Sequence, residues 1–125
     1  MARNSGVVPH VDVVSVTIAN GAAVSGAIDT RRYIGASVDV ADSWSDANLG
    51  FKYCDTVDGT YKVAKDKTGV PIQISGINIT NGAGYAIPTK IFAYPFLKIW
   101  SKHKTAATET NVNQTGAKAL KVMMK

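Results

Sequence analysis

The stretch that decides the fold is Ala47-Asn-Leu-Gly-Phe-Lys-Tyr-Cys-Asp-Thr-Val-Asp-Gly-Thr-Tyr-Lys-Val-Ala-Lys-Asp-Lys-Thr-Gly69. Leu49, Phe51 and Tyr53 lie two residues apart, so in a strand their side chains share one face. The alternate positions, which include Cys54, then share the opposite face. The pattern predicts a strand with an apolar face toward the core and a solvated face that carries Cys54.

Turn residues after this strand predict that the chain reverses twice. The Asp-Gly pair within Asp55–Gly59 tolerates positive φ angles and favours a tight reversal. A return strand is predicted over Thr60–Ala64, and a second turn at Asp66–Gly69 leads into Val70–Ile74. We therefore expect an antiparallel meander whose central hairpin is the quoted stretch.

Length and composition indicate one globular domain. The chain has 125 residues, 46% of them hydrophobic. Residues 1–11 lack strand alternation and are predicted to form a flexible or extended arm, which either docks on a neighbour or is a frayed terminus. Residues 12–125 are predicted to form the domain. Because there is one cysteine, no long apolar run and no signal peptide, we expect a free thiol and a product made in the cytoplasm.

Alternation of apolar residues elsewhere predicts more strands. They run from Asp12 to the Asn20-Gly21 turn, over Arg31–Val40, over the strongly apolar Phe92–Ser101 and over Ala117–Met124, where a short helix is the alternative. Within Arg31–Val40 one face is predicted to carry Ile34, Ala36, Val38 and Val40. Ala22–Ala27 suits an edge strand or a crossing loop. Phe92–Ser101 is expected to be buried on both faces.

The remaining segments are predicted to be irregular. Asn81–Gly84 is too rich in glycine for regular structure, and Pro88 confines its neighbours to a sheet edge or a loop. Lys102–Gly116 is predicted to be a long exposed loop, and Trp44 is expected to cover one end of the core. About eight short strands separated by turns predict an all-β, antiparallel β-sandwich, for which jelly-roll wiring is one arrangement.

No pattern typical of an enzyme, a metal site or a cofactor site is found. His10 and His103 are the two imidazoles, and neither has cysteine or carboxylate neighbours at metal-ligand spacing. Asp55 and Asp58 are explained by turn formation. We therefore predict a protein without catalytic activity, metal or cofactor.

The net charge of +5 is concentrated in the C-terminal half. Its lysines are spread along predicted strands and are not clustered with arginines or aromatics, as a nucleic-acid groove requires. We therefore expect these lysines to lie on a face that is exposed to solvent and binds no partner. Nucleic-acid binding ranks last among the functions considered.

The order of features resembles small β-sandwich virion proteins of tailed bacteriophages, from Asp12 to Val122. The matching positions are Val16–Gly21, Ser25, Ile28-Asp29, Trp44, Ala47, Leu49, Phe51, Asp58–Tyr61, Asp66–Gly69, Phe96–Ser101 and Asn113-Gln114. Relatives of this kind are described as decoration (cement), head-fibre or tail-associated proteins. Where such chains commonly have arginine after the Leu-Lys-Ile segment, this chain has Trp100, which either adds an apolar contact at an interface or extends the core.

The resemblance implies a capsid decoration protein that binds the major capsid protein on the outside of the shell, as a homo-oligomer, expected to be a trimer. Its location would be the virion surface, with no membrane contact. The alternative is a tail or fibre module that binds host glycans through Trp44, Trp100 and Tyr85. Contact residues are predicted in the arm, in the long loop and at the end of the apolar strand before it: Arg3, Val7, Val8, His10, Trp100, His103, Asn113 and Gln114.

Overall fold

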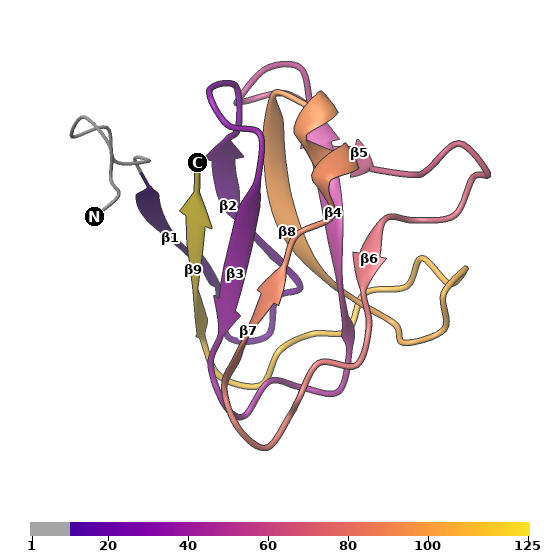
Figure 1. Cartoon of the computed structure of the whole chain (residues 1–125). Coiled ribbons are helices and arrows are strands. Elements are labelled where there is room, and N and C mark those ends of the chain that lie inside the picture. The colour runs from indigo at the N-terminus through magenta and orange to yellow at the C-terminus, as the bar shows by residue number, and fades with distance from the viewer. Residues whose placement is uncertain (1–10) are drawn as a thin grey trace.

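The computed structural model describes residues 11–125, which form two antiparallel sheets (Figure 1). The first sheet has the order β1 (Asp12–Ile18), β9 (Lys118–Met124), β3 (Ala36–Val40) and β7 (Ala83–Ala86). The second has the order β2 (Val24–Asp29), β8 (Phe96–Lys102), β4 (Asn48–Cys54) and β5 (Lys62–Val63), with β6 (Gln73–Ile74) also paired to β4. A short 3-10 helix, η2 (Thr89–Ala93), precedes β8. The predicted all-β, antiparallel sandwich of short strands is confirmed.

The strand pairs are nested along the chain. β1 pairs with β9, β2 with β8 and β3 with β7, while β4 pairs with β5 and β6. The chain therefore folds back on itself about the turn after β4, and its outermost strands are partners. Two further pairings, β3 with β9 and β4 with β8, join these pairs within each sheet.

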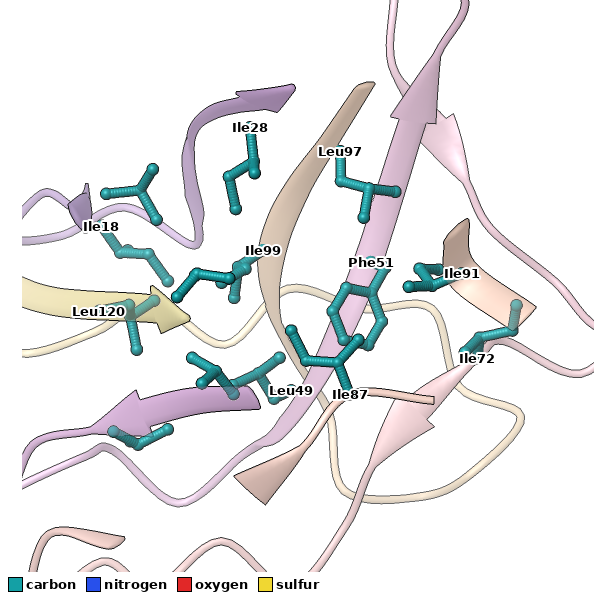
Figure 2. Packing of buried hydrophobic residues seen from close by; sticks show 14 of the residues in the cluster. Ile18, Ile28, Leu49, Phe51, Ile72, Ile87, Ile91, Leu97, Ile99 and Leu120 are labelled. Carbon is teal, nitrogen blue, oxygen red and sulfur yellow. The ribbon is translucent and has the colours of Figure 1, made fainter. Parts of the chain in front are cut away.

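The core lies between the two sheets and follows from the period-two alternation of the strands. In β1, β3 and β9 of the first sheet, and in β4 and β8 of the second, alternate side chains are buried in one cluster. Phe51 is 1% exposed, and Figure 2 shows its ring among other members of this cluster. The labelled members are Ile18, Ile28, Leu49, Phe51, Ile72, Ile87, Ile91, Leu97, Ile99 and Leu120.

The predicted hairpin is present but is not the centre of its sheet. β4 pairs with β5 at two positions and with β8 at seven. The predicted strands Thr60–Ala64 and Val70–Ile74 each shorten to two residues. The predicted turn between them is present, because Asp66 Oδ1 accepts backbone N–H groups from Thr68 and Val70, at 2.8 and 3.2 Å.

Cys54 is buried, which corrects the prediction that it lies on a solvated face. It is 7% exposed, although it does lie on the face opposite Phe51. The turn after β4 folds back over the thiol, and a Cβ atom on Gly59 would lie 2.3 Å from Cys54 Sγ. The turn thus covers a position that the alternation alone leaves in solvent.

Several boundaries also differ from the prediction. The strand predicted over Arg31–Val40 begins at Ala36, and Ile34, predicted on the core face, is 83% exposed. Asn81–Gly84 was predicted to be irregular, but Ala83 and Gly84 begin β7, which is an edge strand that ends before Pro88. The predictions of β1 and of β9 as a strand are confirmed. The edge strand predicted over Ala22–Ala27 is present as β2, shifted to Val24–Asp29. Of the run predicted over Phe92–Ser101, the part from Phe96 is a strand buried on both faces, whereas Phe92 and Ala93 belong to η2.

Candidate interaction surface

The predicted contact residues fall into three groups. Arg3, Val7, Val8 and His10 lie outside the described residues. His103 and Asn113 are exposed on the loop after β8, so their role stays a prediction. Trp100 and Gln114 are each 1% exposed, which corrects their prediction as surface contact residues.

Trp100 is covered by its neighbours on the outer face of the second sheet. Its ring lies over Gly50 of β4, where an added Cβ atom would come within 2.9 Å of the ring. Its indole N–H donates to Asn111 Oδ1 at 2.7 Å, and the Lys52 ammonium lies 5.1 Å from the ring centroid. The glycine directly opposite Trp100 is the signal that could have indicated a packed ring.

Lys102 is fully buried, although it was counted among the exposed basic residues. Its ammonium donates to Gln73 Oε1 at 2.8 Å, to the carbonyl of His103 at 2.8 Å and to that of Thr105 at 3.1 Å, with the Ala106 carbonyl at 3.4 Å. Burial lowers the pKa of Lys102 from its ordinary value. The side chain therefore fixes the start of the long loop and is not available to a partner.

Gln114 closes one end of the sandwich from inside. Its Oε1 accepts the backbone N–H of Ser45 at 2.9 Å, and its Nε2 donates to Ser101 Oγ at 2.8 Å. Its backbone carbonyl and N–H pair with Gly21 and Ala22, both at 2.8 Å. Gln114 thus joins three loops at this end. Trp44, next to Ser45 in the sequence, is 2% exposed and covers this end of the core as predicted.

The opposite end carries the apolar surface that stays open. Val11, Val13 and Ile34 are 49%, 60% and 83% exposed, and Val13 lies opposite the partly buried Met123 on the outer face of the first sheet. We call these four residues the Val13 patch. A hollow of about 410 Å³ beside it is lined by Val11, Gly35, Ala36, Ser37, Met123 and Lys125. Exposed apolar side chains on neighbouring segments are candidates for an interaction surface.

The loop that presents Ile34 is held in place. The backbone N–H groups of Ile34 and Gly35 donate to the Lys125 carbonyl at 2.9 and 3.1 Å, and Lys125 N–H donates back to Gly35 at 3.0 Å. The Tyr33 hydroxyl donates to the Asp12 carboxylate, which raises the pKa of Tyr33. Ile34 is therefore exposed on an anchored loop.

Charged groups lie on the segments that adjoin the Val13 patch, and Lys125 lines the hollow beside it. Arg31 pairs with Asp29 at 2.8 Å, and its hydrogen bonds hold the pKa of that carboxyl at about 2. Asp12, Arg32, Tyr33 and Lys125 line a second hollow of about 330 Å³. An apolar centre with a polar rim is the usual anatomy of a protein contact surface.

Within residues 11–125, no three His, Cys, Asp or Glu side chains gather closely enough to hold a metal ion. No helix in the same range has the length and apolar character needed to cross a membrane.

Comparisons with known proteins identify no relative: no protein-family model, no curated protein and no solved structure matches this chain.

Proposed function

We propose that this chain is a virion structural protein of a tailed bacteriophage, a capsid decoration (cement) protein that binds the major capsid protein on the outer shell as a homo-oligomer. The virion assignment rests on the resemblance of the residues between Asp12 and Val122. The observation that carries a binding role is the Val13 patch, which is apolar, open and adjacent in sequence to the arm, for which docking on a neighbour is one of the two predicted alternatives. No reaction is involved.

Jelly-roll wiring forms part of the proposal. Its support is the nested pairing of β1 with β9, β2 with β8, β3 with β7 and β4 with β5 and β6, together with the separation of these pairs into two facing sheets. Viral capsid proteins are among the proteins built on jelly rolls. Because many other functions use the same fold, the wiring supports the proposal without specifying the partner.

The mechanism is stabilisation by mass action. A protein that binds the assembled lattice and not its separated parts stabilises the lattice by RT ln(1 + [L]/Kd), about 2.7 kcal/mol per site at a hundredfold excess over Kd. The apolar residues of the Val13 patch would supply the contact area, and the anchored Ile34 loop would lose little conformational entropy on binding.

The glycan-binding alternative loses two of its three aromatic platforms. Trp44 and Trp100 are 2% and 1% exposed, so neither ring offers a face for stacking. The Tyr85 hydroxyl accepts the backbone N–H of Asn78 at 2.7 Å. The nucleic-acid alternative also weakens, because Lys102 and Lys118 are buried and Lys104 pairs with Asp46 at 2.7 Å.

The test uses phage shells that lack this protein. Purified full-length chain, a chain beginning at Val11 and an Ile34→Ser variant are added, and bound copies are measured by sedimentation and shell survival by heating. We expect the truncated chain and Ile34→Ser to bind at least tenfold more weakly. Ile79→Ser is the matched control, since Ile79 is 43% exposed but does not belong to the patch.

If the truncated chain and Ile34→Ser bind shells as tightly as the full-length chain does, neither the arm nor the Val13 patch is the contact surface. Failure of every form, the full-length chain included, to bind shells would overturn the decoration role.

A further inference from the structure

We propose that β1 pairs with β1 of a second copy of this chain, antiparallel and about a two-fold axis at Ser15. The two first sheets would then join edge to edge into one sheet across a dimer. The inference is drawn from a comparison of the edge strands of the two sheets. It concerns the purified chain in solution and does not depend on capsid binding.

Among residues 11–125, β1 is an edge strand whose side away from β9 is open from Val13 to Ile18. Figure 1 shows it at the margin of its sheet, and β9 is its one strand partner among residues 11–125. No backbone hydrogen bond from Val13 through Ile18 reaches anything beyond β9 in this range. Such an edge presents a row of N–H and C=O groups that can pair with another chain.

The other sheet edges carry features that block pairing, and β1 does not. β7 has four residues and is followed closely by Pro88. β2 has an irregular register between Val24 and Ala27, and β5 and β6 have two residues each. β1 has seven residues in unbroken register, Asp-Val-Val-Ser-Val-Thr-Ile, without lysine, proline or bulge. Short edges, bulges, lysines and prolines are the usual protections against edge pairing.

The sequence of β1 is compatible with its own copy. With Ser15 opposite Ser15, all seven residues pair, Val13 lies opposite Thr17 and Val14 opposite Val16. Each pair keeps core-side residues together and outer residues together, as antiparallel pairing requires. The two Asp12 carboxylates fall at opposite ends of the pair, about 20 Å apart, so their repulsion is small.

An opening between the sheets lies beside the same edge. A hollow of about 400 Å³ is lined in part by Val14 of β1, Ile28 of β2 and Met124 of β9. Val14 is itself partly exposed. A second copy at this edge would place its own Val16 next to Val14 and so extend the apolar layer over the opening.

The experiment measures the mass of the purified full-length chain by sedimentation velocity from about 1 µM to about 1 mM, without capsid. We expect a dimer that forms as concentration rises. Ser15→Asp should weaken the dimer at least tenfold, because two carboxylates would meet at the two-fold axis. In the single chain the new carboxylate faces Lys121, so the variant should still fold, which a thermal melt checks. Ala119→Asp is the matched control, because Ala119 is exposed on β9, which lies between β1 and β3 and away from the edge.

A cysteine pair tests the register. In the proposed pair the two Ser15 Cα atoms lie about 4.5–5.5 Å apart, within the range of a disulfide. Ser15→Cys should therefore cross-link two chains when oxidised glutathione is added. Thr17→Cys should not, because its two copies would lie about 13 Å apart.

A monomer at every concentration would overturn the proposal. So would a dimer or trimer that Ser15→Asp leaves unchanged and that Ser15→Cys does not cross-link.

Discussion

At the scale of single residues, Lys102 shows how a buried charge can hold a loop. Its ammonium donates hydrogen bonds to one side-chain amide oxygen and to backbone carbonyls of the loop that follows β8, in place of the hydrogen bonds that it would make to water. These acceptor oxygens therefore point toward the Lys102 ammonium. The loop is therefore held to the sheet by a residue that the charge pattern alone assigned to the surface.

We expect Lys102→Met to cost about 1 to 3 kcal/mol of unfolding free energy, because it removes the hydrogen bonds to Gln73 Oε1 and to the carbonyls of His103 and Thr105. Chemical denaturation measures the loss, and limited proteolysis should show earlier cleavage near Thr105. Lys104→Met is the control. It removes an exposed pair with Asp46 and should cost less than about 1 kcal/mol. Similar losses for both variants would contradict the buried role of Lys102.

A second prediction at this scale concerns Gly59 and Cys54. An alanine Cβ at position 59 would lie 2.3 Å from Cys54 Sγ and 2.6 Å from Thr56 Oγ1, so Gly59→Ala should cost about 1 to 3 kcal/mol. Adding Cys54→Ala removes the sulfur and should recover about 1 kcal/mol relative to the sum of the single changes. A double-mutant cycle from denaturation curves measures this coupling. Strict additivity would show that the turn does not pack on the thiol.

At the scale of elements, the pair of β4 and β8 supports the second sheet. Phe51 lies on the inner face of β4, opposite Ile99, and is 1% exposed. Phe51→Ala should cost about 3 to 5 kcal/mol by deleting a buried aromatic ring. The melting temperature should fall accordingly, and Thr60→Ala, in the exposed turn, should leave it nearly unchanged. An unaltered melt for Phe51→Ala would contradict the register of β4.

Elements with unbroken alternation were predictable, and those shaped by distant contacts were not. β1 and β9 alternate along their length, and the apolar run of β8 indicated burial on both faces. The burial of Trp100 and Lys102 depends on a loop that returns over the sheet, and the exposure of Ile34 depends on backbone bonds to Lys125. None of these contacts leaves a period in the sequence.

At the scale of the whole molecule, nested pairing makes the two ends of the described chain unequal. β1 lies at an edge, while β9 lies between β1 and β3 and pairs with both. β9 pairs with strands from the beginning and the middle of the described chain. The first sheet therefore cannot form completely until β9 has been synthesised. Such long-range pairing also predicts slow folding, in milliseconds to seconds.

Truncation from each end tests this inequality. A chain that begins at Val11 should melt within a few degrees of the full chain, because residues 1–10 lack strand alternation. A chain that ends at Ala117 loses β9 and with it the buried side chains of Leu120, Val122 and Met124. It should show no cooperative melt by circular dichroism, since β1 and β3 would lose their shared partner and the core one of its walls. A cooperative melt in the chain ending at Ala117 would mean that the first sheet can form without its central strand.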